Sequence, residues 1–304
     1  MAKLSVVISA YNEETNIANC LKSVANLADE SIVVDNQSTD RTAKIAADLS
    51  AQVFSRPNNL MFNVNKNFGF TKATGDWLLN LDADEEVTPE LKDEIITLLS
   101  EPRPEINGYW IPRKNIIFGK WIKHAFWWPD EQLRLFRRGK GKFPEKHIHE
   151  YLSIDGPTGH LTSALSHLSY TGISHFVDKL DKAKTESEAE TLYRNGQKTK
   201  WQDFLNQPID DFLKIYFLQS GNKDNLHGLV LAYLQSFYSI LTLSKVWEKE
   251  GFPDINVNQD EFTKLLKQKI KEINYWLISR EIENTNNQLQ KTILKLKRKL
   301  FLSQ

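Results

Sequence analysis

Trp77-Leu78-Leu79-Asn80-Leu81-Asp82-Ala83-Asp84 is a short apolar run that ends in two acidic residues. A run of this length followed by polar residues predicts a buried strand over residues 77–81. Similar short runs occur at residues 4–10, 31–35 and 52–55, and segments with helical periodicity separate them. This alternation predicts an α/β fold, with a mostly parallel sheet and helices on both of its faces.

Polar clusters follow three of these predicted strands at their carboxyl ends. The first strand is followed by Tyr11-Asn12-Glu13-Glu14, the second ends in the polar stretch from Asp35 to Thr42, and the fourth runs into Asp82-Ala83-Asp84-Glu85-Glu86. Ligands of open α/β sheets bind outside the carboxyl ends of the strands. Three acidic or amide-rich clusters at one edge therefore favour a site for a nucleotide together with a metal ion.

Asp82 and Asp84 are two residues apart, so in extended backbone their carboxylates project to the same side. That spacing lets them share one ion, and hard oxygen ligands suit Mg²⁺ or Mn²⁺. The structural alternative is an acidic turn that caps the next helix, which is predicted to start near Thr88 with Pro89 in its first turn. The position directly after an apolar strand favours the metal hypothesis.

The composition sets broad limits on function. The chain has 304 residues, with 39 Lys plus Arg and 39 Asp plus Glu, so its net charge gives no reason to expect nucleic acid as a partner. A single cysteine, Cys20, excludes an internal disulfide framework and fits a reducing cytoplasm, where we expect it to be a small core residue. The first strand turns polar at Tyr11, too soon for a secretory signal.

The pattern along the chain changes near residue 175. Residues 107–175 are rich in aromatic residues, Gly and Pro, with strand-like runs at 109–112 and 132–136. This composition predicts an irregular continuation of the sheet. Long helical patterns follow, with few Gly or Pro. We therefore expect a catalytic domain over residues 1–175 and a helical C-terminal region over residues 176–304.

The helical region contains two unusual segments. Residues 225–244 carry no Asp, Glu, Lys or Arg, but polar residues interrupt them, so we expect them to lie in a membrane interface or to pack against the catalytic domain. From residue 264 to residue 304 there are ten Lys or Arg against three Asp or Glu. A basic amphipathic end attracts anionic lipid headgroups, although an ordinary solvated helix face has the same composition.

Four motifs, taken together in order and spacing, resemble family 2 glycosyltransferases of the GT-A fold, a Rossmann-like nucleotide-binding fold. They are residues 6–14 (VVISAYNEE), Asp35-x-x-Ser38-Thr39-Asp40-x-Thr42, Asn67-x-Gly69-x5-Gly75-Asp76-Trp77 and Asp82-Ala83-Asp84. Downstream, Trp128-Pro129-Asp130, residues 134–138 (RLFRR) and His147-Ile148-His149-Glu150 are similar to the bacterial branch that includes lipopolysaccharide-core glucosyltransferases. The resemblance covers residues 4–175.

The resemblance implies roles for particular residues in binding a nucleotide sugar. The backbone of Ala10 and Tyr11, with Glu13, would lie along the base and ribose, and Asp35 would bind the uracil edge; helix capping is the alternative for both acids. His149 would be a further metal ligand. Contacts with the nucleotide sugar are also expected from Lys66 and Asn67, and Arg134 is a candidate partner for the diphosphate.

An inverting sugar transfer requires one general base, which takes the proton of the attacking acceptor hydroxyl. Asp130 is the candidate, because the preceding Trp127-Trp128-Pro129 would place apolar neighbours around it, raise its pKa and let a ring stack on a sugar. Glu131 is the second candidate. A turn-forming Pro-Asp before a strand is the structural alternative.

The resulting hypothesis is an inverting, metal-dependent transferase that moves a sugar from a nucleotide diphosphate donor, UDP-hexose, to a lipid-linked or oligosaccharide acceptor in cell-envelope polysaccharide or lipopolysaccharide synthesis. We expect a cytoplasmic protein with peripheral association at the inner face of the plasma membrane. Alternatives are a protein or peptide acceptor and a catalytically silent nucleotide-sugar-binding scaffold. A sugar nucleotidyltransferase would need a Gly-rich phosphate loop after the first strand, and Tyr11-Asn12-Glu13-Glu14 is not one.

Overall fold

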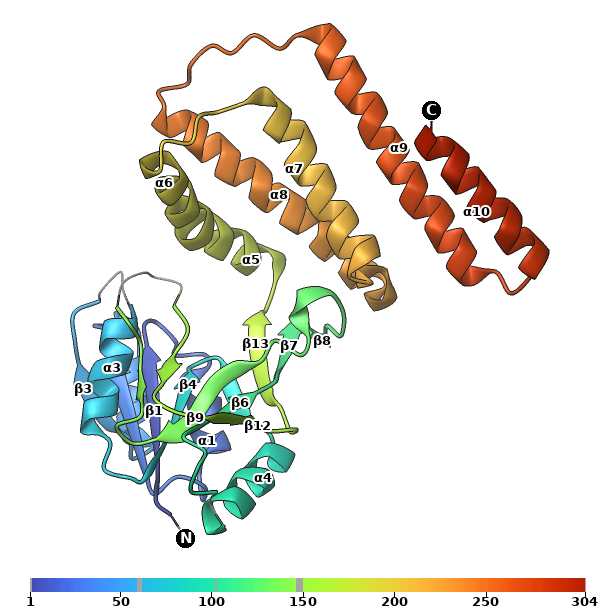
Figure 1. Ribbon diagram of the computed structural model, residues 1–304. Coiled ribbons are helices and arrows are strands. Elements are labelled where there is room, and N and C mark those ends of the chain that lie inside the picture. Colours follow the sequence, from blue (N-terminus) through green and yellow to red (C-terminus); the bar gives the residue numbers. More distant parts are fainter. Residues whose placement is uncertain (1, 59–61, 102, 146–149, 304) are drawn as a thin grey trace. The chain divides into compact units, whose positions relative to one another are not determined.

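The computed structural model describes residues 2–58, 62–101, 103–145 and 150–303 (Figure 1). The chain forms two compact units. The first, here the sheet unit, comprises residues 1–121 and 127–169, and the second, here the helical unit, comprises residues 122–126 and 170–304. The division into functional domains at residue 175 stays a prediction.

The sheet unit is built on a seven-stranded mixed sheet with the strand order β12-β6-β9-β4-β1-β2-β3. Strands β3, β2, β1 and β4 run parallel, and β9 is antiparallel to both β4 and β6. The predicted α/β fold with a mostly parallel sheet is confirmed. The strands are β1 (Leu4–Ala10), β2 (Glu30–Asp35), β3 (Gln52–Ser55), β4 (Trp77–Asp82), β6 (Gly108–Ile111), β9 (Gln132–Arg137) and β12 (Thr158–His160).

A second sheet begins directly after the acidic motif. Its order is β5-β13-β7-β8, and the strands are β5 (Glu85–Val87), β7 (Arg113–Ile117), β8 (Lys120–Trp121) and β13 (Leu165–Tyr170). Because β5 pairs antiparallel with β13, it places His167 opposite Glu85. Strands β13 and β7, which are distant from β4 in the sequence, thus lie in the sheet that begins at the end of β4. A short ribbon, β10 (Gly141–Lys142) with β11 (Ser153–Ile154), completes the strands.

Helices cover both faces of the main sheet. They are α1 (Ile17–Ser23), α2 (Thr42–Asp48), α3 (Phe62–Lys72) and α4 (Pro89–Ser100). A short 3₁₀ helix, η1 (Ala125–Trp127), lies at the boundary between the two units along the sequence. The start of α4 is the predicted one. Thr88 caps it by accepting a hydrogen bond from the Leu91 N–H at 3.3 Å, and Pro89 occupies its first turn, where no N–H partner is needed.

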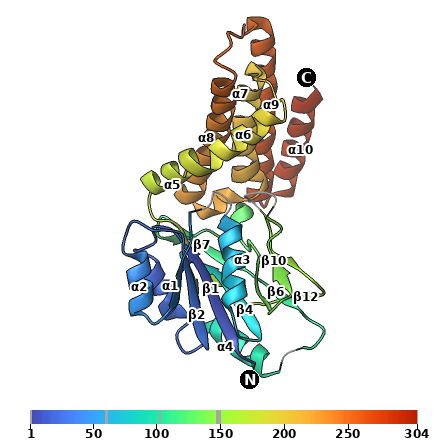
Figure 2. The ribbon, with the colours of Figure 1, turned by 90° about the vertical axis from the view of Figure 1, so that its left-hand side faces the viewer.

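The alternation of side chains along β1 divides the core into two layers. Val6 and Ile8 pack with α1 and α4 in one buried cluster, which also contains Cys20 as the expected core residue. Val7 belongs to a second cluster on the opposite face, where α3 crosses the sheet (Figure 2). Gly69 lets α3 approach closely, since a Cβ there would lie 2.5 Å from a Val7 methyl carbon.

The helical unit consists of long helices joined by short connections. Its elements are α5 (Ile173–Lys179), a π-helical turn η2 (Leu180–Thr185), α6 (Glu186–Arg194), α7 (Trp201–Leu213), η3 (Lys214–Leu218), η4 (Gly221–Asp224), α8 (Leu226–Lys249), α9 (Gln259–Asn284) and α10 (Gln288–Ser303). Helices α7 and α8 lie side by side, and α9 and α10 form a helical hairpin (Figure 1).

Within the described ranges, α8 is the one helix long and apolar enough to cross a membrane by length and composition. A third of its most apolar stretch, 33%, is buried in the protein, and core helices of helical bundles meet the same criterion. One face of α8, which includes Leu231, Leu243 and Val246, is buried. Lys245 also forms an ion pair with Asp181 at 2.9 Å. This face of α8 is thus buried within the helical unit, and both expectations for residues 225–244 stay predictions.

Candidate active site

A small cavity of about 150 Å³ lies at the carboxyl end of β4, between α3, β7 and β9. Cations and carboxylates converge on it from strands that are far apart in the sequence. The lining residues are Asn63, Lys66, Asp82, Arg113, Gln132, Leu133, Arg134, Phe143, Glu150, Tyr151 and Leu152.

Asp82 lies between two cations. The Lys66 Nζ is 2.6 Å from its Oδ1, and the Arg134 guanidinium contacts its Oδ2. Burial by itself would raise the pKa of Asp82, but the charges of Arg134 and Lys66 outweigh it and hold the pKa well below its ordinary value. Three residues predicted for the site, Lys66, Asp82 and Arg134, are thus in direct contact.

Glu85 connects Asp82 to the neighbouring strands, and the sequence motifs had not singled it out. Its side chain is fully buried, and its carboxylate contacts Arg134 at 2.6 Å and Arg113 at 3.0 Å. It also accepts the Asp82 backbone N–H at 3.0 Å. A buried carboxylate needs such partners, because an uncompensated charge in the interior is very costly. Glu85 therefore holds both arginines in the site.

Asp130 is reached through Arg113. Two Arg113 nitrogens donate to its Oδ2 at 2.7 and 3.0 Å, Asn115 donates to the same oxygen at 2.9 Å, and Gln132 donates to Oδ1 at 3.1 Å. The prediction that apolar neighbours surround the Asp130 carboxylate is therefore wrong. The Trp128 ring packs instead against Trp121, with centroids 5.1 Å apart. The polar partners fix the orientation of the carboxylate.

His167 was also missed, since it stands in an ordinary alternating strand. Its Nδ1 lies 2.6 Å from the Asn115 Oδ1, while the Asn115 amide nitrogen donates to Asp130 and to the Trp127 carbonyl. The Asn115 oxygen consequently accepts a hydrogen bond from the Nδ1–H group, which leaves Nε2 facing the Asp84 carboxylate at 3.5 Å. Only the pairing of β13 with β5 reveals this position.

The described part of the chain holds no cluster of three His, Cys, Asp or Glu side chains close enough to bind a metal ion together. Asp84 and His167 nevertheless offer one oxygen and one nitrogen ligand that face each other, which is a donor set that Mn²⁺ accepts. Asp82 differs, because both of its oxygens contact cations. The sharing of one ion by Asp82 and Asp84 stays a prediction, and His149 lies outside the described residues.

The residues predicted for the base and ribose gather at the ends of β1 and β2. Ala10 is buried and its carbonyl accepts the Asn36 N–H at 2.8 Å, whereas Tyr11 is largely exposed. Asp35 is buried and accepts the Ser38 N–H at 3.3 Å. Glu13 accepts a hydrogen bond from the Asn16 side-chain amide at 2.7 Å, so this contact is not a helix cap, and its role at the nucleotide stays a prediction.

Two further candidates do not line the cavity themselves. The Asn67 amide donates to the Phe143 carbonyl at 2.9 Å, and the Phe143 N–H donates back at 3.0 Å, so Asn67 ties α3 to the 143–145 segment. Glu131 lies 2.8 Å from the His160 Nδ1. Neither side chain lines the cavity at Asp82, and neither does Asp130, but Asp130 is hydrogen-bonded to Arg113, which does line it.

Comparison with known proteins gives a consistent picture. Residues 5–153 match the family model described as glycosyl transferase family 2. An uncharacterized glycosyltransferase of Rickettsia typhi is 31% identical over 258 residues, which cover 82% of this chain and 88% of the relative. LpsC of Rhizobium meliloti, a lipopolysaccharide core biosynthesis glycosyltransferase, is 26% identical, with coverage of 82% and 93%.

The solved structures that match this chain include two bacterial proteins. Residues 1–349 of TarS from S. aureus, crystallised with UDP, have 16% identity and a TM-score of 0.42, with 84% of this chain and 94% of that chain covered. Glucosyl-3-phosphoglycerate synthase from Mycobacterium tuberculosis, crystallised with Mn²⁺ and UDP-glucose, has 25% identity and a TM-score of 0.32, with 38% and 44% covered.

Proposed function

Since the chain belongs to the family 2 glycosyltransferases, we propose that it transfers a hexose from UDP-hexose, with inversion, to a saccharide of a cell-envelope glycolipid. The observation that carries this proposal is the connection between Asp82, at the end of β4, and Asp130, through Glu85 and Arg113. One polar network thus joins the expected donor-binding motif to the expected base. The relationship to LpsC supports lipopolysaccharide synthesis as the setting.

The diphosphate of the donor would bind between Lys66 and Arg134. Both cations are paired with Asp82, and a diphosphate offers them more negative charge and the oxygen geometry that a guanidinium fork matches. The cavity of about 150 Å³ is smaller than pockets that enclose a whole ligand, which span roughly 300–1,000 Å³. It suits the diphosphate, with the uridine extending toward Tyr11 and Asp35.

A divalent cation, Mn²⁺ or Mg²⁺, would be held by Asp84 and His167, with Asp82 beside them. When bound, it would neutralise the charge that develops on the departing diphosphate. The hydrogen bond from Nδ1 to Asn115 keeps the His167 Nε2 directed at Asp84, as partners of metal-binding histidines usually do.

Asp130 would accept the proton of the acceptor hydroxyl. Arg113 and Asn115 hold its Oδ2, so the carboxylate has a fixed direction before the acceptor arrives. Replacing Asp130 with Asn keeps the shape but removes the base, and we expect transfer to fall at least about 100-fold, as loss of a general base commonly does. Donor binding should change little. Near-normal transfer by this variant would assign the role to another residue.

We also propose that the protein is cytoplasmic and associates peripherally with the inner face of the plasma membrane through α10. Leu289, Ile293 and Leu296 form an exposed apolar stripe along this helix. Leu294 is buried, and Arg298 donates to the Ser279 hydroxyl of α9 at 2.9 Å, so this side of α10 faces α9 and the apolar stripe faces away from α9.

The charges of α10 suit the same surface. The helix has five Lys or Arg residues and no acidic residue. Helical geometry puts Lys297 on one side of the apolar stripe and Lys295 and Lys299 on the other. An apolar stripe with lysines along both borders favours the interface of an anionic bilayer.

The membrane proposal is tested by flotation. The full chain should float with anionic liposomes at low salt, and a chain that ends at residue 284 should not. Neutral liposomes and high salt are the controls, because both remove the attraction between lysines and lipid headgroups. If the full chain stays in the soluble fraction, or the shortened chain floats equally well, the membrane proposal fails.

The central test is a donor screen. Thermal stabilisation and slow donor hydrolysis are measured with UDP-, GDP-, ADP- and dTDP-sugars, each with Mn²⁺, with Mg²⁺ and with a chelator. We expect a metal-dependent response to a UDP-hexose that is lost in Asp82→Asn. Binding without hydrolysis or transfer would favour a catalytically silent scaffold, and the absence of a metal-dependent response to any donor would contradict the proposal.

A further inference from the structure

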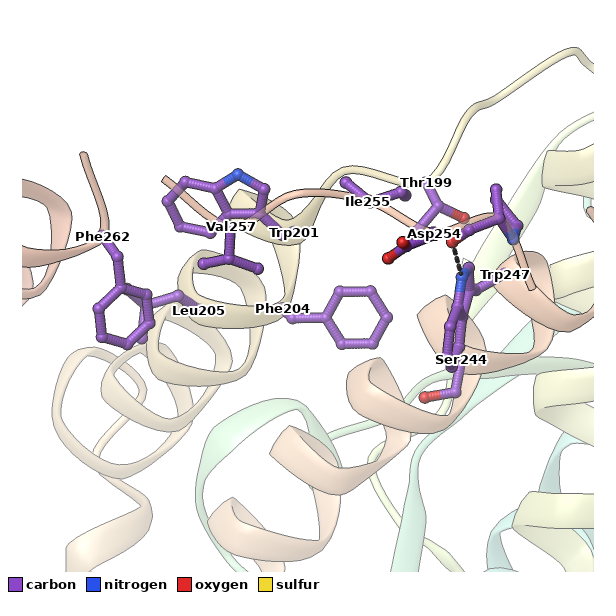
Figure 3. Close-up of a pocket in the computed structure, with 11 residues that line it drawn as sticks. Thr199, Trp201, Phe204, Leu205, Ser244, Trp247, Asp254, Ile255, Val257 and Phe262 are labelled. Carbon is purple, nitrogen blue, oxygen red and sulfur yellow. Dashed lines mark hydrogen bonds between the residues drawn. The ribbon is translucent and has the colours of Figure 1, made fainter. Parts of the chain in front are cut away.

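The helical unit contains a second cavity, of about 460 Å³, separate from the residues discussed so far (Figure 3). Its walls come from the start of α7, the end of α8, the 253–257 segment and the start of α9. A cavity of about 150 Å³ lined by aliphatic and aromatic side chains holds one benzene-sized molecule. This cavity has about three times that volume, so it has room for a ligand several times larger than benzene.

The lining changes from apolar to polar along the cavity. Trp201, Leu205, Val257 and Phe262 surround one end (Figure 3). The other end carries the three polar side chains among the lining residues, Thr199, Ser244 and Asp254. A ligand that matches both ends has a hydrocarbon part and a polar part.

The cavity is formed in advance of any ligand. The Trp247 indole N–H donates to the Pro253 carbonyl at 2.9 Å, which ties the 253–257 segment to α8. On the other side, the Thr199 N–H donates to the Glu250 carboxylate at 2.9 Å. Fixed walls lower the entropic cost of binding, because the protein has little left to order.

Charge decides which polar group fits the polar end. Asp254 is the ionisable residue among those that line the cavity, and a carboxylate accepts hydrogen bonds from hydroxyl groups but repels an anionic headgroup. Lys198, next to Thr199, is paired with Glu250 at 3.3 Å and does not line the cavity. A neutral, hydroxyl-rich group is therefore favoured over a phosphate or carboxylate.

We propose that this cavity binds a glycolipid, with the hydrocarbon chain between Trp201, Leu205 and Phe262 and a sugar at Asp254. The apolar end of the cavity removes the hydrocarbon chain of the ligand from water, and burial of each methylene contributes to affinity. The sugar hydroxyls donate to the Asp254 carboxylate. The identification of this glycolipid with the acceptor of the enzyme rests on the proposed function, whereas the binding chemistry does not.

The test uses the full chain and simple alkyl glycosides below their micelle concentration, with isothermal titration calorimetry. Octyl β-glucoside should bind, and methyl β-glucoside should not bind in the same concentration range. Each methylene should tighten binding about fourfold, so octyl glucoside should bind roughly 15-fold more tightly than hexyl glucoside. The heat capacity change should be negative, as burial of apolar surface requires.

Two variants assign the binding to this cavity. Asp254→Asn, on the exposed segment, should weaken octyl glucoside binding by about tenfold, because a charge-assisted hydrogen bond is lost, and should strengthen octanoate binding, because a repulsive charge is removed. Leu205→Asp places a charge at the apolar end and should abolish octyl glucoside binding. Its control is Leu226→Asp, at a side chain that is 67% exposed at the start of α8 and does not line the cavity, which should bind normally.

Three results would overturn the proposal: no binding of octyl glucoside, equal binding of methyl and octyl glucoside, or binding that neither Asp254→Asn nor Leu205→Asp alters. Failure of the proposed function gives a different pattern. A protein that binds octyl glucoside but transfers no sugar contradicts the transferase proposal alone, and an active transferase that does not bind octyl glucoside contradicts this inference alone.

Discussion

Glu85 offers the sharpest test of the charge network, because its side chain is fully buried and contacts two arginines. Glu85→Gln keeps the size and the oxygen that accepts the Asp82 N–H, but it removes the charge between Arg113 and Arg134. Those side chains are only 15% and 6% exposed, so water can replace little of the lost interaction. Removal of one partner from a buried ion pair costs about 3–5 kcal/mol.

We expect the lower end of this range, because Asp82 still pairs with Arg134 and Asp130 still pairs with Arg113. A loss of about 3 kcal/mol corresponds to roughly 6–12 °C in the melting temperature of a unit of this size. Differential scanning calorimetry measures this shift, with the transition of the sheet unit identified through its response to nucleotide and metal. Urea titration followed by circular dichroism gives the free energy of unfolding independently.

Glu86→Gln is the matched control. Glu86 is the next residue of β5 and is only partly buried, so the same chemical change there should alter the free energy of unfolding by less than about 0.5 kcal/mol. If Glu85→Gln costs less than about 1 kcal/mol, or no more than Glu86→Gln, Glu85 does not hold the two arginines, and the connection between Asp82 and Asp130 loses its support.

Three further outcomes follow from individual contacts. His167→Ala should lower the affinity for Mn²⁺ more than about tenfold, measured from the dependence of the melting temperature on the Mn²⁺ concentration. An unchanged dependence would show that His167 is not a metal ligand. The pKa of Asp82 is lowered in the folded protein, so the stability that its charge contributes is complete above about pH 4, the ordinary pKa, and is lost as the pH falls through the lowered pKa. Asp82→Asn should remove this part of the acid dependence of the unfolding free energy, measured by urea titrations between pH 2 and 5. An acid dependence identical to that of the unaltered protein would contradict this prediction. Gly69→Ala places a Cβ 2.5 Å from a Val7 methyl and should destabilise the sheet unit by about 1–3 kcal/mol in thermal melts, and an unchanged melting temperature would contradict the close approach of α3 to β1.

Local patterns in the sequence were sufficient for six of the seven strands of the main sheet, whereas β12 was not predicted. The observed bounds of β1 and β3 coincide with the predicted runs at 4–10 and 52–55, and Thr88 and Pro89 begin α4 as expected. These features depend on neighbouring residues alone: the length of an apolar run, a capping hydroxyl and a proline that needs no N–H partner. The polar clusters at the ends of β1, β2 and β4 follow from the same logic, because parallel strands bring their carboxyl ends to one edge.

The partners of Asp82 and Asp130 depend instead on strand pairing between distant segments. Glu85 and Arg113 are 28 residues apart, and Asn115 and His167 are 52 apart. They meet because β5 leaves the main sheet directly after the acidic motif and pairs with β13, next to β7. No periodicity in the sequence records such a pairing.

The amino-acid sequence by itself thus determined the α/β class and the edge of the sheet at which the polar clusters after β1, β2 and β4 gather. Tertiary structure alone decided what surrounds Asp82 and Asp130. Asp130 was expected among aromatic rings because Trp127 and Trp128 precede it, yet Arg113, Asn115 and Gln132 bind its carboxylate. The physical reason is that neighbours in sequence set the backbone, whereas a buried charge takes its partners from whichever strands the fold brings within hydrogen-bond distance.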